Sequence, residues 1–171
     1  MVSALRLEDL LFLEGWDWEG DVRRLELAPG EKKTLVDVRA RKGFFFGAVA
    51  AFTGGDDAKF AYLLVNCDNT FYMPLYPYGL SLLGLDMWLP YGVVLLKYDT
   101  IADIYIVAHS PNYMIPYRKK LEITIGYPEK VRMWFGEHVN KKTITAYVAY
   151  LYIRIIDEER FRESYREMFG R

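Results

Sequence analysis

Few residues in this sequence could carry out metal, nucleophilic or acid–base chemistry, and they are spread widely along the chain. It contains two histidines, His109 and His138, and one cysteine, Cys67. A metal site would need such side chains to converge with a carboxylate, and neither an i, i+4 spacing nor a CxxC motif supports that arrangement. We therefore expect both histidines to be ordinary polar residues at strand ends.

Cys67 would act as a nucleophile only beside a base that lowers its pKa. It follows an apolar run and precedes Asp68 and Asn69, a pattern typical of the end of a strand. Free cysteines are usually buried, so we predict a structural thiol here. With a single cysteine, the chain cannot form an internal disulfide.

The acidic residues do not form a recognisable catalytic pair. Glycoside hydrolysis needs two carboxylates about 5–9 Å apart across a cleft, whereas these residues occupy turns and loops, where Asp is favoured for backbone reasons. A calcium loop would need spaced oxygen ligands that are missing, so we expect a solvated hairpin tip at residues 56–57. We predict no catalytic residue, no cofactor and no metal ligand. The acidic groups considered are Asp17/Glu19/Asp21, Asp56/Asp57 and Asp99/Asp103.

Aromatic side chains are abundant: 14 Tyr, 10 Phe and 4 Trp make up 16% of the chain. Tyr and Trp suit surfaces that are partly apolar and partly wet, so aromatic loops favour protein interfaces and sugar-stacking platforms. The same loops could instead fold back and cover the protein's own core. We predict a partner or ligand surface formed by Tyr76, Tyr78, Trp88, Tyr91, Tyr113 and Tyr117.

Composition limits the class of protein. A chain of 171 residues with 52% hydrophobic residues predicts one domain over residues 1–171 with a sizeable core. The net charge of −1 argues against a nucleic-acid partner. The first residues lack a basic region, and no apolar run is long enough to span a membrane, so we expect neither a signal peptide nor a transmembrane segment. We expect the protein in the cytoplasm or in a virus particle.

The amide content points to the source of the protein. Gln is absent, Asn occurs only at positions 66, 69, 112 and 140, and 26% of residues are charged. Few thermolabile amides together with many charges favour a thermophilic source.

Alternating apolar residues predict a succession of β-strands. In residues 120–126, Leu121, Ile123 and Ile125 share one face, which is the period-2 pattern of a half-buried strand. Residues 44–52 are continuously apolar and predict a strand buried on both faces. The other expected strands are residues 22–27, 34–38, 59–66, 93–98, 103–108, 131–135 and 143–156.

Three segments do not fit the strand pattern. Residues 74–92 hold three prolines and three glycines, which exclude a central strand, although residues 80–85 could form a helical turn. Residues 1–21 predict an N-terminal arm or a short helix. Residues 157–169 predict a C-terminal helix, because Asp157 can cap it, Gly170 can end it and an i, i+4, i+7 apolar stripe begins at Phe161. We expect this helix to dock on the strands or on a neighbouring subunit.

Eight to nine short strands followed by one helix predict an all-β fold, an antiparallel β-sandwich. A jelly roll is the leading topology, because it needs about eight strands and permits one long loop. An immunoglobulin-like sandwich is the alternative, but it favours a shorter chain with a Cys or Trp core marker.

Residues 25–127 resemble β-sandwich accessory proteins of bacterial and archaeal virus particles. The resemblance is carried by the order of the segments LELAPGEKKTLVDVRARKGFFFGAVAAF, AKFAYLLVNCD, a Tyr/Pro/Leu/Gly loop, ADIYIVAHS and IPYRKKLEITIGYP. The last of these is also similar to strands in jelly-roll domains attached to glycan-active proteins. The resemblance is one of strand spacing, and it assigns no functional residue.

Two functions of different classes follow. The first is a non-catalytic structural or interaction protein: a self-assembling virion component (capsid, decoration or tail) of a thermophilic virus or provirus, whose partners are copies of itself or other structural subunits. The alternative is a carbohydrate-binding module or small glycan-active enzyme that uses the aromatic loops. A cupin-like enzyme is a third option, but two histidines do not supply its usual metal cluster.

Overall fold

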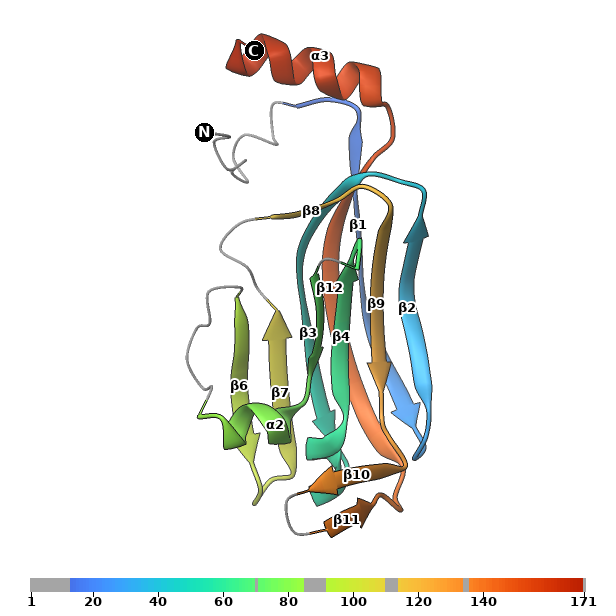
Figure 1. Cartoon of the computed structure of the whole chain (residues 1–171), viewed down its shortest axis with the longest axis vertical. Coiled ribbons are helices and arrows are strands. Elements are labelled where there is room, and N and C mark those ends of the chain that lie inside the picture. Colours follow the sequence, from blue (N-terminus) through green and yellow to red (C-terminus); the bar gives the residue numbers. More distant parts are fainter. Residues whose placement is uncertain (1–12, 70, 85–91, 110–113, 134–135, 171) are drawn as a thin grey trace.

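The computed structural model describes residues 13–69, 71–84, 92–109, 114–133 and 136–170. Antiparallel strands dominate, and a helix of 12 residues follows the last strand (Figure 1), which confirms the predicted fold class. The elements are β1 (Trp16–Leu27), β2 (Lys32–Arg39), β3 (Gly43–Thr53), the 3-10 helix η1 (Asp56–Phe60), β4 (Tyr62–Cys67), β5 (Phe71–Leu75), α2 (Pro77–Leu82), β6 (Val93–Asp99), β7 (Ile104–His109), β8 (Ile115–Tyr117), β9 (Lys120–Gly126), β10 (Lys130–Met133), β11 (Gly136–Val139), β12 (Ile144–Ile155) and α3 (Glu158–Phe169).

The described strands form two large sheets and one hairpin. The first sheet has the order β1-β12-β3-β7-β6, with β8 pairing β3, and the second has the order β2-β9-β4-β5. Strands β10 and β11 form a separate hairpin at the end opposite α3 (Figure 1). Pairing is nested along the sequence, because β4 pairs β5, β3 pairs β7, β2 pairs β9 and β1 pairs β12. The chain is thus a long antiparallel ribbon folded over on itself.

The side chains that the two large sheets turn toward each other form one hydrophobic core. In β3, Phe45 and Phe52 are fully buried, and in β9 the same is true of Leu121, Ile123 and Ile125. The apolar face predicted for residues 120–126 is therefore the core face. Because side chains alternate along a strand, Glu122 and Thr124 of β9 point away from the core.

A smaller apolar cluster fixes α3 to the opposite face of the first sheet. Asp157 caps the helix by accepting a hydrogen bond from the Arg160 backbone N–H, and Gly170 ends it in the left-handed conformation. Phe161 packs in a cluster whose buried members include Leu13 and Ile153. The helix, both of its end signals and its docking on the strands confirm the sequence prediction.

Two expected boundaries are wrong. Strand β1 begins at Trp16, so residues 16–21 belong to a strand and not to the expected arm or helix; residues 1–12 lie outside the described part of the chain. Most side chains of this edge strand are exposed, so acidic residues cost little there, and these charges hid the alternating apolar pattern. The strand expected over residues 59–66 begins only at Tyr62, because residues 56–60 form η1.

Strand β3 also differs from the expectation of burial on both faces. Its core face is closed, but the side chains that point away from the core, among them Val49 and Ala51, are only half-buried. The cluster around α3 covers this outer face at one end, at Phe44 and Phe46. The rest of this apolar outer face is not covered by any element in the described part of the chain.

Candidate functional site

The structure can place three of the six residues predicted to form a partner or ligand surface. Tyr76 is the N-cap of α2 and Tyr78 lies in its first turn, and both are half-buried. Trp88, Tyr91 and Tyr113 lie outside the described residues. The third residue that can be placed, Tyr117, does not lie on the surface.

Tyr117 belongs to the core, which corrects its assignment to a partner surface. Its side chain is 1% exposed, and its hydroxyl donates a 2.9 Å hydrogen bond to the Ile153 carbonyl. Burial raises the pKa of this phenol well above its ordinary value. The short strand β8 pairs with β3 at Gly43, whose missing side chain leaves room for the Tyr117 ring. Nothing in the local sequence distinguishes this inward residue from an exposed aromatic.

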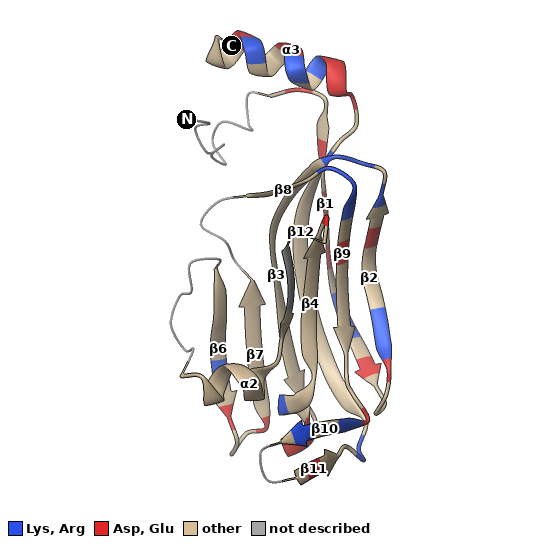
Figure 2. Ribbon diagram, in the orientation of Figure 1, with Lys and Arg blue, Asp and Glu red and all other residues tan. Residues whose placement is uncertain are grey.

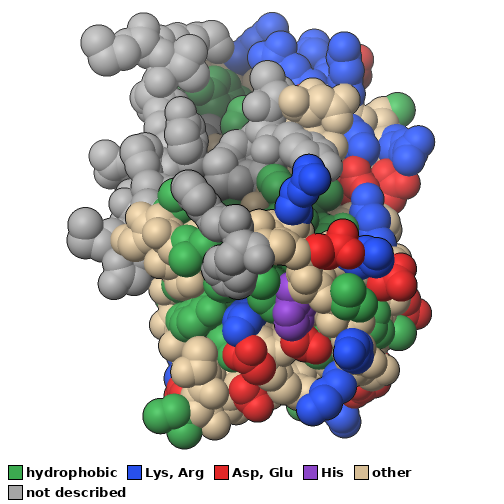
Figure 3. All heavy atoms as spheres, turned by 60° about the horizontal axis from the view of Figure 1, so that its bottom comes forward, with side chains coloured by type: hydrophobic (Ala, Val, Ile, Leu, Met, Phe, Trp, Pro, Cys, Tyr) green, Lys and Arg blue, Asp and Glu red, His purple; other side chains and the backbone are tan. Residues whose placement is uncertain are grey.

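Tyr76 and Tyr78 line an aromatic groove between α2 and β10, near the end of the molecule shown in Figure 3. The Phe60 ring lies 5.1 Å from the Tyr78 ring in an edge-to-face contact, and Tyr76 lies 5.0 Å from Tyr62. The groove has a volume of about 410 Å³, and a basic side chain of β10, Lys130, stands at its wall. Its lining residues are Phe60, Tyr76, Tyr78, Gly79, Leu82, Pro128, Lys130, Val131, Arg132 and Met133.

The two histidines have different structural contacts. His138 of β11 lies 2.8 Å from Asp57 through Nε2 and packs against the Phe60 ring, so it ties the hairpin to η1. His109 is 1% exposed and stacks on Phe45 at 5.2 Å between ring centroids. Among the described residues, no three His, Cys, Asp or Glu side chains come together in a way that could hold a metal ion.

Cys67 is buried, as predicted, and burial raises the pKa of its thiol to about 12. The thiol is therefore protonated at neutral pH and is a poor nucleophile.

The acidic residues at 56–57 begin η1, so the expected hairpin tip is wrong, although Asp56 is exposed as expected. Asp56 accepts hydrogen bonds from Lys59 and from the Tyr105 hydroxyl, and the Lys59 bond is the main cause of the lowered pKa of Asp56. Asp57 pairs with His138. Both residues thus hold η1 against neighbouring elements.

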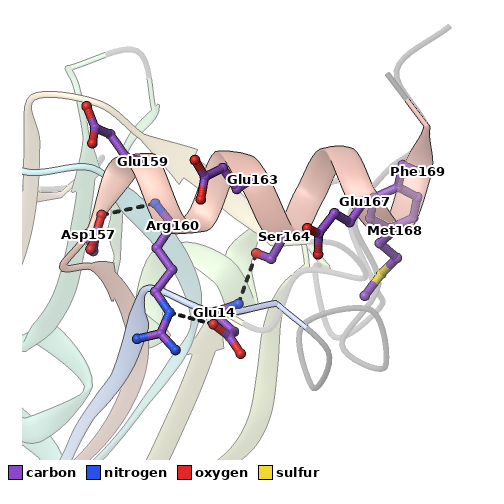
Figure 4. A pocket seen from close by; sticks show the side chains of 9 residues that line it. All are labelled: Glu14, Asp157, Glu159, Arg160, Glu163, Ser164, Glu167, Met168 and Phe169. Atoms are coloured by element: carbon purple, nitrogen blue, oxygen red, sulfur yellow. Dashed lines mark hydrogen bonds and ion pairs between the residues drawn. The ribbon is translucent and has the colours of Figure 1, made fainter.

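A depression beside α3 is lined mainly by acidic side chains (Figure 4). Glu14 forms an ion pair with Arg160, and its backbone N–H donates to the Ser164 hydroxyl at 3.1 Å. These contacts attach the helix to the residues that precede β1. We interpret this region as the docking site of α3.

The strongest candidate for a functional surface is the open sheet face, which we define as the outward residues Val22, Val49, Ala51, Ile106, Tyr147, Ala149 and Leu151 of the first sheet. Their strands pair in register, with Val22 opposite Ala149, Ala149 opposite Val49, and Tyr147 opposite Ala51. The outer face therefore presents a contiguous row of apolar side chains. A shallow depression of about 680 Å³ crosses it from β1 to β7.

The open sheet face is exposed at three of its residues, and its charged neighbours lie on the flanking strands, with Arg24 opposite Tyr147 and Lys97 opposite Ile106. Val22 is 78% exposed, Tyr147 46% and Leu151 38%. Strands β3 and β7 contain no charged residue, whereas charges gather on β1, β2 and α3 (Figure 2). A sequence signal for this face was available, because residues 44–52 are apolar at both inward and outward positions.

No protein-family model and no curated protein sequence matches this chain. No helix in the described part of the chain is long and apolar enough to cross a membrane.

Proposed function

We propose that this chain is a non-catalytic structural subunit that assembles with copies of itself. The observation that carries the proposal is the open sheet face, where Val22, Tyr147 and Leu151 are exposed side by side. Contiguous exposed apolar surface on a soluble domain marks an interaction site. Two such faces can pack together as sheets do in a β-sandwich, about 10 Å apart.

A chemical role has less support from the side chains. His138 and the acidic residues at 56–57 hold elements of the fold together, and His109 is buried against Phe45. The thiol of Cys67 is buried and protonated at neutral pH. These residues serve stability, which agrees with a structural role.

We further propose that the topology is a jelly roll and that the assembly is a virus particle of a thermophilic virus or provirus. Support for the topology comes from the nested pairs and from the strand orders β1-β12-β3-β7 and β2-β9-β4-β5. Jelly rolls build viral capsids and also lectin domains and cupins. The step from fold to particle is an analogy, because one fold serves many functions.

One substitution on the open sheet face and one control substitution outside it test the proposed assembly surface. Leu151→Lys places a charge on the open sheet face, where its burial in an interface would be costly. Ile101→Lys is the control, because Ile101 is 96% exposed in the turn between β6 and β7. We expect Leu151→Lys to weaken self-association at least tenfold and Ile101→Lys to leave it unchanged, as measured by sedimentation velocity. Equal behaviour of the two variants would contradict the role of the face.

The aromatic groove supports a second candidate function, glycan binding. Phe60, Tyr76 and Tyr78 line one depression with a basic side chain at its wall, and aromatic rings beside polar groups suit sugar stacking. Tyr78→Ala should then abolish binding in a glycan-array or calorimetric titration, while Tyr147→Ala, on the open sheet face, should not. Retention of glycan binding by Tyr78→Ala would exclude the groove.

A further inference from the structure

Strand β1 forms one edge of the first sheet, and within the described part of the chain it pairs only with β12. It spans 12 residues, and residues 20–24 are all exposed. A long exposed edge is a template for pairing with another strand, so proteins usually interrupt or cover such edges.

Among the described strands, the other three edges of the two large sheets carry interruptions that β1 lacks. Strand β2 has a register shift between Thr34 and Val36, and β6 has one between Leu95 and Lys97. Strand β5 contains Pro74, which cannot donate a backbone hydrogen bond. The β1–β12 register, in contrast, is continuous from Trp16 to Leu27. The edge of β1 is therefore the most regular one available for pairing.

The backbone of β1 shows which residues face the open edge. The N–H groups of Trp18 and Val22 donate to the side chains of Asp17 and Asp21, both at 2.8 Å, and not to β12. Because N–H groups alternate in direction along a strand, the even-numbered residues of β1 present their backbone groups to the edge. In the isolated chain the acidic side chains accept hydrogen bonds from these N–H groups. The backbone carbonyls of another strand can take the place of these carboxylates.

Charge along this edge changes sign at Val22. Asp21 comes directly before it and Arg23 directly after it, and in the isolated chain these two form an exposed ion pair with a separation of 2.6 Å. In an antiparallel pair, residues directly opposite each other point to the same face. A two-fold axis through Val22 would therefore place each Asp21 opposite the Arg23 of the other copy.

Neighbouring registers lack this complementarity. An axis through Asp21, Arg23 or Arg24 would place two like charges opposite each other, and an axis through Gly20 would oppose Glu19 to Asp21. Like charges directly opposite each other destabilise a strand pair. Among these five registers, only the one centred on Val22 has no such conflict.

We propose that β1 is an interface at which two copies of this chain pair edge to edge, antiparallel, about a two-fold axis through Val22. This inference deepens the proposed self-assembly and rests on it. Each Asp21 exchanges its intrachain partner for the Arg23 of the second copy, and the Val22 N–H exchanges the Asp21 carboxylate for a backbone carbonyl. The first sheet then runs continuously through both copies, with both open sheet faces on one side.

Charge reversal tests the interface with its own control. Asp21→Arg gives two basic residues at positions 21 and 23, and Arg23→Asp gives two acidic residues, so each variant repels itself at the axis. We expect each variant alone to lose β1 pairing, with at least a tenfold weaker association in sedimentation velocity. A 1:1 mixture of the two should restore it, because both opposed pairs are then of opposite sign. The double variant Asp21→Arg/Arg23→Asp should also associate.

A cysteine on the axis tests the register. In the proposed register the two copies of residue 22 form a hydrogen-bonded pair with Cα atoms about 5.5 Å apart, within disulfide range. The native Cys67 is buried and does not compete. We expect Val22→Cys to form a covalent dimer under mild oxidation, and Ile101→Cys, at a 96% exposed position, to form little.

The outcomes separate this inference from the proposed function. The β1 interface is wrong if the wild-type protein associates, the charge reversals leave that association unchanged and Val22→Cys forms no covalent dimer. Assembly through the open sheet face then stands. If association weakens with Arg23→Asp but not with Leu151→Lys, the edge is the interface and the role of the open face is wrong. A wild-type protein that remains monomeric overturns both.

Discussion

At the scale of single residues, Asp68 shows how a side chain that resembles a functional carboxylate serves the fold. Its carboxylate accepts hydrogen bonds from the backbone N–H groups of Arg118, Lys119 and Lys120, at 2.6–2.8 Å. Burial alone would raise the pKa of Asp68, but these three donors outweigh it and lower the pKa. The residue thus joins the end of β4 to the turn before β9.

We predict that Asp68→Ala lowers the free energy of unfolding by about 1–2 kcal/mol, because three charge-assisted bonds are lost and water can replace some of them. Asp68→Asn keeps the shape but not the charge. Because the folded-state pKa of Asp68 is lowered, its carboxylate stabilises the protein above the unfolded pKa of about 3.9 and loses that effect as pH falls through the folded value. Urea unfolding should therefore show the wild type and Asp68→Asn converging below about pH 4. A constant difference at every pH would refute this role.

At the scale of elements, periodicity and end signals made most of the fold predictable. The core face of residues 120–126 and the cap and stop of α3 follow from local sequence, and the structure confirms both predictions. The start of β1 was missed because charged residues are tolerated on an open edge. The sequence pattern does not predict the short strands β5, β8 and β11, and it predicts β10 with other bounds. So few residues leave little periodicity to detect.

The docking of α3 gives a prediction at this scale. Phe161 packs in the cluster around Leu13 and Ile153, and its ring lies 6.3 Å from that of Phe44. We expect Phe161→Ala to lower the free energy of unfolding by about 2–3 kcal/mol, as the loss of a largely packed aromatic implies. Glu163→Ala, on an exposed position of the same helix, should change it by less than about 0.5 kcal/mol. Equal effects of the two in urea unfolding would show that α3 does not depend on this contact.

At the scale of the whole molecule, the candidate site could be predicted only in part. Tyr76 and Tyr78 line one groove, whose role as a partner or ligand surface stays a prediction, whereas Tyr117 is buried. The open sheet face arises from four strands that are distant in sequence and become neighbours only through the nested pairing. Its signal was present in the doubly apolar residues 44–52, but sequence alone cannot say whether such a face is covered by the same chain or by another.

The most direct test of self-assembly is the mass of the wild-type protein in solution, measured by light scattering across a range of concentrations. The chain has a mass of 20.0 kDa. We predict a mass that is a multiple of this value or rises toward one with concentration, because an exposed apolar sheet face favours association. A mass that stays at 20.0 kDa at every concentration tested would contradict self-assembly.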